Sequence, residues 1–557
     1  MRPEALARYW HTLRPLKPVQ WYGRAWFRLH RPTPSLGPPP PLRRPSGAWV
    51  APAGGEPSLL GPTRLRFLNE SHDCATAAAW NDPARDKLWL YNLHYFDDLA
   101  ADGAEARTEW QRAWVARWID ENPPASGNGW EPYPCSLRIV NWIKWSLGGQ
   151  PLAPAWQHSL AVQLRWLRRR LEFHLLGNHL FANAKALLFG GLYFEGDEAA
   201  AWQRRALAIL RRQLPEQVLA DGGHFERSPM YHALMLQDVL DLLNAIRALA
   251  PPGSPAADFA PALQAVVAPM LRWLAAMTHP DATPGLFNDC AAGVAPTLEQ
   301  LQRYAARLGL APPDATLPPL LRLDASGYAR VALGPAVLQV DAAPVGPDYL
   351  PGHAHADTLS FELSLAGRRL IVNGGTSCYG SGPARLRERS TAAHSTVEVA
   401  GQDSSQVWSG FRVGRRARPT PLRATAAAGQ IDLAAAHDGY RFLPGRPLHE
   451  RAWSLDPAGL SVSDRVTNPA LPAVARYLLA PGLSLQGDGA GAWLVIDGAR
   501  PLARVAVQAG TGVAVPAACA SRFGIVEATV GLAVTLAGGR ADTRWTWLDD
   551  DAHPLSH

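Results

Sequence analysis

The hydrophobic periodicity of this 557-residue chain changes from helical to alternating near a proline-rich segment at residues 312–319. Before that segment, from about residue 80 to 280, apolar residues recur at helical spacing, as Trp110, Trp114 and Trp118 do. After it, short runs alternate between apolar and polar residues. This pattern predicts an all-helical domain followed by an all-β domain.

The helical half contains amphipathic stretches separated by short turns rich in Gly, Pro or Asp. They are residues 109–121, 136–148, 155–175, 179–194, 197–213, 228–249 and 258–277. Short links between long helices predict antiparallel helical hairpins packed side by side. A solenoid would need a sequence motif that recurs every 34–45 residues or so, and no such motif is found.

The second half contains many short segments typical of strands. They are residues 328–340, 359–365, 369–372, 395–399, 452–462, 493–496, 504–507 and 531–536. Together they predict an antiparallel β-sandwich. Residues 1–60 are rich in Pro and Arg and predict an arm after one short helix that contains Tyr9 to Leu13. The predicted domains are residues 1–80, 81–315 and 316–557.

Composition narrows the classes of protein to which the chain can belong. Hydrophobic residues make up 47% and charged residues 18%, which is a globular composition. The net charge of +6 forms no single basic stripe, so a nucleic-acid partner is not expected. The five scattered cysteines include no C-x-x-C pair, so neither a disulfide framework nor a thiolate zinc site is expected.

Two expectations concern membranes and targeting. We find no run of about eighteen apolar residues, so a membrane-spanning helix is not expected. The first 21 residues lack the apolar region of a signal peptide. The sequence therefore predicts a cytoplasmic protein, or a periplasmic one if export uses another route.

Two polar segments at predicted helix starts are candidate sites in the helical half. In GNHLFAN (177–183), Asn178 either caps the helix that follows or offers its amide to a ligand. In DGGHFERSPMYH (221–232), Tyr231 and His232 fall in the first turn of a helix, where the dipole favours a phenolate. Tyr231 is therefore either a candidate base or a buried tyrosine that donates one hydrogen bond.

Histidines mark the candidate site in the β half. In GHAHADTLSFEL (352–363), His353 and His355 point to the same face if the segment is extended. Asn373 and His394 follow on neighbouring predicted strands. Two imidazoles and one oxygen donor would suit zinc, although a neutral Asn is a poorer third ligand than a carboxylate.

Four segments, in this order, resemble the heparinase II/III-like polysaccharide lyases, a group that includes alginate lyases. They are GNHLFANAKALLFGGLYF (177–194), DGGHFERSPMYHALMLQDVLDLL (221–243), GHAHADTLSFELSLAGRRLIVNGGTSCY (352–379) and RSTAAHSTVEVAGQDSSQVW (389–408). The similarity spans roughly residues 90–470. It implies an incomplete (α/α) toroid followed by an antiparallel β-sandwich, with an active site in the cleft between them.

The resemblance also implies roles for individual residues. Asn178 matches the residue that neutralises the uronate carboxylate of an anionic polysaccharide or oligosaccharide. Tyr231 matches the Brønsted base or acid, and His353 matches the catalytic histidine of the sandwich. His355, Asn373 and His394 match the ligands of one structural zinc or other divalent ion, with Asn373 where the family usually has Asp. No organic cofactor is implied.

Further residues are predicted to line the cleft, because arginine pairs with carboxylates and sugar rings stack on aromatic side chains. They are Tyr133, Arg138, His179, Arg227, His232 and Arg389. The dipeptide Asn288-Asp289 either orients a residue of the cleft or forms an Asx turn, and the turn is the preferred interpretation.

The residues leave three functions open. The first is a lyase that cleaves a uronate polymer by β-elimination. The second is a hydrolase, which needs two opposed carboxylates, and Glu226 and Asp289 are the obvious pair. The third is a non-catalytic factor in bacterial exopolysaccharide synthesis, which the Asn373 replacement and the basic arm would suit.

Overall fold

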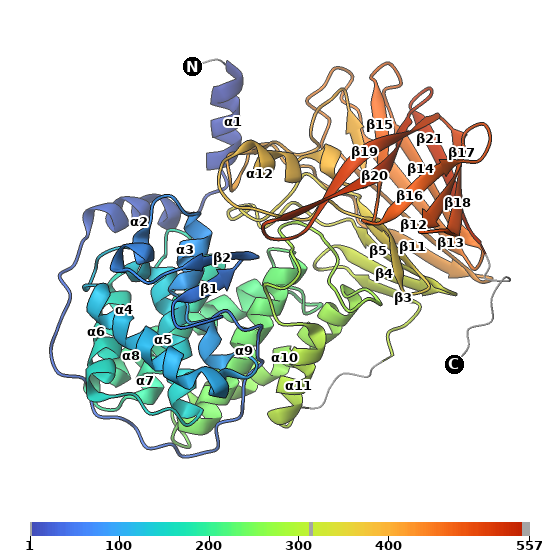
Figure 1. Ribbon diagram of the computed structural model, residues 1–557. Coiled ribbons are helices and arrows are strands. Elements are labelled where there is room, and N and C mark those ends of the chain that lie inside the picture. The colour runs from blue at the N-terminus through green and yellow to red at the C-terminus, as the bar shows by residue number, and fades with distance from the viewer. Residues whose placement is uncertain (1–2, 311–315, 549–557) are drawn as a thin grey trace, which may run out of the picture.

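The computed structural model describes residues 3–310 and 316–548, which form a helical half and a β half (Figure 1). The change falls between α11 (Leu298–Arg307) and β3 (Leu320–Leu323), as the periodicity predicts. The predicted fold class, an incomplete (α/α) toroid followed by an antiparallel β-sandwich, is confirmed.

Long helices pack against each other to form the toroid, with α5 against α7, α7 against α8 and α9 against α10. The helices are α3 (Lys87–Leu93), α4 (Thr108–Glu121), α5 (Pro132–Leu147), α6 (Pro154–Arg169), α7 (Gly177–Tyr193), α8 (Asp197–Gln217), α9 (Pro229–Leu249), α10 (Ala260–Ala276) and α11. α6 ends at Arg169 and does not continue to residue 175. The chain leaves the helix at Arg170. The link to α7 is held by a hydrogen bond from the backbone N–H of Glu172 to Asn183 Oδ1 at 2.9 Å, and it turns into α7 at Leu176, which has a φ of +65°.

The apolar stretch Ala257–Ala276 bears on the expectation that no helix spans a membrane. By length and composition alone it could cross a membrane, with a mean hydropathy of 1.3. However, it packs against α9 and α11, and its side chains Leu263, Met270 and Trp273 are fully buried. The core of the molecule therefore accounts for the large apolar side chains on the inner face of this helix, and 44% of its most apolar window is buried.

The β half is a sandwich of two antiparallel sheets. Among the described residues, one sheet has eight strands in the order β11-β12-β13-β14-β21-β18-β17-β16. The other has nine, in the order β19-β20-β15-β7-β6-β5-β4-β3 with β8 paired to β15. Their bounds are β3, β4 (Tyr328–Leu333), β5 (Ala336–Asp341), β6 (Phe361–Leu365), β7 (Arg368–Val372), β8 (Val397–Val399), β11 (Arg423–Ala427), β12 (Gln430–His437), β13 (His449–Asp456), β14 (Gly459–Val466), β15 (Ala473–Leu479), β16 (Leu483–Gly487), β17 (Ala492–Asp497), β18 (Arg500–Ala509), β19 (Thr511–Arg522), β20 (Ile525–Thr535) and β21 (Arg540–Trp547).

Two segments predicted as single strands are hairpins. Residues 328–340 divide into β4 and β5 around Gly334, whose φ of +57° allows the tight turn. Residues 452–462 divide between β13 and β14. Because the apolar alternation continues through each turn, the pattern alone does not reveal the reversal of the chain.

The N-terminal arm holds more structure than the one short helix that the sequence predicts. It contains α1 (Pro3–Leu13) and α2 (Pro18–Leu29), and a hairpin of β1 (Arg64–Phe67) and β2 (Glu70–Asp73) follows it. α1 lies against the β half, where Tyr9 meets Trp408 of β9 (Val407–Trp408) edge-on at 5.2 Å. α2 lies on the toroid, where Gly23 packs against His174. The arm therefore crosses from one half of the molecule to the other (Figure 1).

Candidate active site

Tyr231 and His353 come from different halves of the chain and lie in contact. Ser228 caps α9, because its Oγ accepts a hydrogen bond from the backbone N–H of Tyr231 at 3.2 Å, and Pro229 follows at the first helical position. Tyr231 therefore stands in the first turn of α9, with 9% of its surface exposed. Its ring stacks on the His353 imidazole with centroids 3.9 Å apart and planes inclined by 30°. The two halves share one site at this pair.

A carboxyl group lies at each ring nitrogen of His353. Nδ1 is hydrogen-bonded to Asp289 Oδ2 at 2.9 Å, and Nε2 lies 3.4 Å from Glu226 Oε2. The Asp289 side chain therefore orients His353, which is the alternative interpretation of Asn288-Asp289, and the preferred Asx turn is wrong. An ionised Asp289 only accepts hydrogen bonds, so neutral His353 carries its proton on Nδ1 and a lone pair on Nε2.

Asp289 is the buried centre of a charged network. Arg385 on α12 (Pro383–Glu388) donates to both carboxylate oxygens, with Nη2 at 2.7 Å from Oδ2. His355 Nε2 is hydrogen-bonded to Oδ1 at 2.8 Å. Burial alone would raise the pKa of Asp289, but Arg385 and the two imidazoles hold it well below its ordinary value. Asp289 is therefore ionised, and its oxygens are fully occupied.

Asn178 lies inside the first turn of α7 and not at its cap. The N-cap is Leu176, whose side chain forms no cap, so the capping interpretation of Asn178 is wrong. Gly177 has a φ of +53°, and a side chain there would collide with its neighbours. The start of α7 lies against Glu226, because a side chain at Gly177 would meet Glu226 Oε1 at 2.7 Å. Burial raises the pKa of Glu226, and the neighbouring His353, then His179 and the Asn178 backbone, partly offset that increase. Because Glu226 also neighbours His353, Asn178 belongs to the same cluster.

The Tyr231 phenol is neutral in the resting site. Burial, followed by the neighbouring Tyr379, raises the pKa of Tyr231 well above its ordinary value. Desolvation thus outweighs the helix dipole on which the sequence argument relied. The hydroxyl oxygens of Tyr231 and Tyr379 lie 2.9 Å apart, within hydrogen-bond distance. Tyr379 lies within the third family-like segment, but nothing in its residue type or spacing had singled it out.

His179 and Tyr133 form a second pair beside Asn178. Their ring centroids are 4.5 Å apart, and His179 Nδ1 is hydrogen-bonded to Glu172 Oε1 at 3.2 Å. Burial opposes the charged imidazole, but the Glu172 carboxylate outweighs it and raises the pKa of His179. A cationic imidazole at this place is suited to a sugar carboxylate, so the two residues stay predicted substrate contacts.

Two arginines that were predicted to bind substrate are enclosed by protein. Arg138 is fully buried in the toroid, where Nε donates to Gln163 Oε1 at 2.9 Å and the guanidinium lies 3.7 Å from the Trp118 ring centroid. Arg389 is equally buried, and its Nη2 donates to the Ala354 carbonyl at 2.9 Å. Burial lowers the pKa of each to about 10. Neither guanidinium is available to a substrate, although Arg389 fixes the loop beside His353.

His232 and Arg227 also face away from the stacked pair. His232 is fully buried on Trp273, with ring centroids 4.3 Å apart, and both of its nitrogens are hydrogen-bonded to backbone groups. Burial lowers the pKa of His232 to about 3. Arg227 donates from Nε to the Ser326 carbonyl at 3.0 Å and so joins the helical half to the β half. These two residues hold the frame of the site.

The predicted zinc ligands lie together but do not form a usual zinc site. His355 Nδ1 faces His394 Nε2 at 3.2 Å. The Asn373 side chain donates to Ser360 Oγ at 3.2 Å and accepts from the backbone N–H of Ser395 at 3.3 Å. Within residues 3–310 and 316–548, no group of three His, Cys, Asp or Glu is arranged to hold a metal. Two imidazoles and a hydrogen-bonded neutral amide do not fit zinc, so no step below uses a metal.

The poor fit of His355, Asn373 and His394 to zinc leads to a prediction about the metal content of the protein. We expect purified protein to contain far less than one zinc per chain and its Tm to be unchanged by a chelator. Elemental analysis after dialysis and thermal unfolding with and without EDTA test both points. Stoichiometric zinc, together with a lower Tm after chelation, would contradict the expectation.

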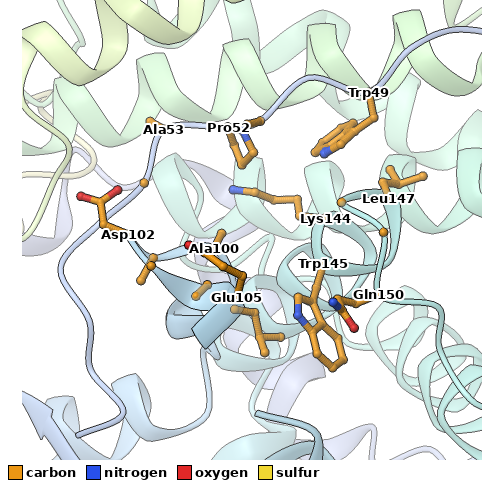
Figure 2. Close-up of a pocket in the computed structure, with 18 of the residues that line it drawn as sticks. Trp49, Pro52, Ala53, Ala100, Asp102, Glu105, Lys144, Trp145, Leu147 and Gln150 are labelled. Carbon is orange, nitrogen blue, oxygen red and sulfur yellow. The ribbon is translucent and has the colours of Figure 1, made fainter. Parts of the chain in front are cut away.

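A cavity of about 810 Å³ lies elsewhere on the toroid, with Trp49, Lys144 and Trp145 among its lining residues (Figure 2). Lys144 stands in the last turn of α5, whereas Tyr133 stands in the first. At 1.5 Å per residue the two are roughly 16 Å apart along the helix. The cavity shares no lining residue with the cluster around His353, so it is a separate feature.

Curated relatives include enzymes and a protein of another kind. The heparin-sulfate lyase of Bacteroides stercoris is 27% identical over 251 residues, which are 41% of this chain and 36% of that protein. FtsZ-localized protein C of Caulobacter vibrioides is 28% identical over 455 residues, which are 76% of this chain and 72% of that protein. The chain thus matches just over a third of the length of the curated lyase.

Solved structures and family descriptions cover more of the chain. A heparinase III crystal structure has a TM-score of 0.62 at 16% identity and covers 88% of this chain and 81% of that one. The heparan sulfate lyase HepC of Pedobacter heparinus has a TM-score of 0.57 at 18% identity, with coverage of 96% and 88%. Residues 76–308 match the description "Heparinase II/III N-terminus", and residues 315–547 match "Heparinase II/III-like, C-terminal". The chain belongs to the heparinase II/III-like family.

Proposed function

We propose that this protein is a polysaccharide lyase that cleaves a uronate-containing anionic polysaccharide by β-elimination. The observation that carries the proposal is the stacked pair of Tyr231 and His353, with Asn178 in the same cluster. Family membership and the similarity to heparin-sulfate lyases support it.

Asn178 would stabilise the charge that forms first. Removing the C5 proton of a uronate places extra negative charge on its carboxylate. The half-buried Asn178 amide forms no hydrogen bond to another described side chain and is free to donate to that carboxylate. One such donor is typically worth about 3 kcal/mol in the transition state.

His353 and Tyr231 divide the two proton transfers. The lone pair on His353 Nε2 takes the C5 proton, and the C5–H electron pair becomes the C4–C5 double bond while the C4–O4 bond breaks. The neutral Tyr231 phenol gives its proton to O4. Asp289 stabilises the imidazolium through Nδ1, and Tyr379 donates to the phenolate that remains.

Hydrolysis by opposed carboxyl groups is less well supported. Glu226 and Asp289 lie at the two nitrogens of one imidazole, so His353 fills the space between them. Asp289 is held ionised by Arg385 and is fully hydrogen-bonded. A glycoside hydrolase instead needs one protonated acid and room for a sugar between its two carboxyl groups.

A panel of uronate polymers tests the proposed reaction. β-Elimination leaves an unsaturated 4,5-uronate end that absorbs in the ultraviolet, whereas hydrolysis yields reducing ends without that absorbance. We expect absorbance to increase with at least one polymer. Reducing ends without absorbance would show a hydrolase, and polymer binding without either product would show a binding protein.

Replacing Asn178 with alanine is expected to lower kcat/KM by about 10²- to 10³-fold, because the carboxylate loses its donor. Initial rates of ultraviolet absorbance measure the effect. Asn468→Ala, on a distant loop of the β half where the side chain bonds the Pro444 carbonyl, is the control and should keep the wild-type rate. An Asn178→Ala variant as fast as the control would remove Asn178 from the mechanism.

A binding or assembly role is the second candidate. It is favoured by the similarity to FtsZ-localized protein C, which extends over 76% of this chain. The polymer panel separates the two roles, since only a lyase produces unsaturated ends.

A further inference from the structure

The helix α2 is apolar on the side that faces away from the protein. Large side chains there are exposed to solvent: Trp21 by 51%, Tyr22 by 65%, Trp26 by 62% and Leu29 by 82%. At 100° per residue, these four and Ala25 fall within an arc of about 140°. Gly23, on the opposite side, packs against His174 of the toroid. We call Trp21, Tyr22, Ala25, Trp26 and Leu29 the outer face of α2.

Arginines flank the outer face without compensating acids. Arg24, Arg28 and Arg31 are exposed, and none forms an ion pair with a carboxylate in the described part of the chain. Arg24 also lies near Arg412 of β10 (Arg412–Val413). Although its side chain reaches solvent, Arg24 is partly enclosed by protein. This partial burial, followed by the positive charges of Arg412 and Arg28, lowers the pKa of Arg24. The result is a cluster of like charges that attracts an anion.

The charge of the whole chain is concentrated in this region. Residues 1–31 contain seven Lys or Arg and one Glu, a net charge of +6. The whole chain has 54 basic and 48 acidic residues, which is the same net charge. The remainder of the chain is therefore neutral, and an anionic partner is drawn to the N-terminal helices.

We propose that α2 docks this protein on an anionic lipid bilayer, with its outer face among the headgroups and its arginines against lipid phosphates. Tryptophan and tyrosine are the residues that favour the boundary between water and lipid. An amphipathic helix with such a face and flanking arginines lies in the plane of the interface. The outer face is convex, whereas sites for sugars are concave, so a polysaccharide fits it less well.

The docked helix would bring the bilayer close to the candidate active site. Gln20 of α2 donates from Nε2 to the Tyr349 carbonyl at 3.0 Å, and the stretch from His174 leads into α7 with Asn178 in its first turn. The proposal does not depend on lyase activity, because the docking surface shares no residue with the stacked pair.

Vesicle binding by the full chain tests the proposal. We expect the wild type to co-sediment with phosphatidylcholine vesicles that contain roughly 30% phosphatidylglycerol, much less with pure phosphatidylcholine, and less as salt increases. The variant Trp21→Ser/Trp26→Ser/Leu29→Ser should bind at least tenfold more weakly. Val513→Ser/Val526→Ser is the control, because these side chains are 53% and 51% exposed on the sandwich.

The Tm values and the vesicle binding of the variants together support or overturn the proposed membrane docking. Equal Tm values for the variants and the wild type would show that folding is intact, as expected for exposed positions. The proposal fails if the wild type does not bind anionic vesicles, or if the triple variant binds them as tightly as the control does. It also fails if the triple variant loses only its binding to a soluble uronate polymer, which would make the outer face a polysaccharide surface.

Discussion

Replacing Tyr231 with phenylalanine is expected to lower kcat by about 10²- to 10⁴-fold, because it removes the proton donor for O4. The ring, and with it the contact on His353 at 3.9 Å, would stay in place. Polymer binding should therefore change little while turnover falls. Stopped assays of unsaturated product, together with a binding isotherm for the polymer, measure the two separately.

Tyr193→Phe is a matched control for this prediction. Its hydroxyl lies 2.8 Å from Ser146 Oγ at the far end of α7, away from the stacked pair. It should keep the wild-type kcat. If Tyr231→Phe also kept it, the phenol would have no part in proton transfer and the proposed mechanism would be wrong.

The second large effect is expected from Arg385→Met. The substitution leaves the buried Asp289 carboxylate without its guanidinium, and breaking a buried ion pair in this way typically costs about 3–5 kcal/mol. In the wild type the depressed pKa of Asp289 stabilises the folded state at every pH above the ordinary carboxyl pKa. That contribution is lost as the pH falls through the depressed folded pKa. In Arg385→Met, much of this contribution to the free energy of unfolding should already be missing at neutral pH. Denaturant unfolding of the variant and the wild type at pH 7 measures the difference.

Activity should fall in Arg385→Met as well, since Asp289 positions His353. Arg451→Met is the matched control. In the sandwich, Arg451 pairs with Asp464, which is also hydrogen-bonded to His449 at 2.8 Å and to Tyr477. The pKa of Asp464 is lowered to about 2. We expect a similar loss of unfolding free energy without a loss of kcat in the folded fraction. Equal kcat values in the two variants would show that Arg385 has a structural role only.

The sequence was informative wherever a pattern repeats along the chain. Helical and alternating periods predicted the two halves, and the cap Ser228-Pro229 placed Tyr231 in a first turn, where it lies. Side-chain partners that are distant in the chain were not predictable. Arg138 and Arg389 have the right residue type for binding a carboxylate, but core groups and backbone carbonyls occupy their guanidinium groups.

The same limit explains the site residues that sequence reasoning missed. Asp289 was a candidate carboxylate in the sequence, but its partners were not predictable, because only the fold brings Arg385 and two histidines to it. Tyr379 belongs to the candidate site because its hydroxyl is hydrogen-bonded to that of Tyr231, a contact that the sequence does not reveal. Desolvation is also a property of the folded state, and it decides between the two interpretations of Tyr231 in favour of a neutral phenol.

The path of the N-terminal arm has a consequence for how substrate enters. The covalent link between the toroid and the sandwich runs from α11 to β3. The N-terminal arm forms a second connection between the two halves. Tyr9 packs on Trp408, and the Gln20 side chain donates a hydrogen bond to the Tyr349 carbonyl. Because the helical half and the β half are joined at two places, they cannot move apart as freely as two domains joined by a single linker. For the proposed lyase, a long polymer would have to thread between these two connections, and we expect it to act more readily on chain ends than in the middle of a polymer.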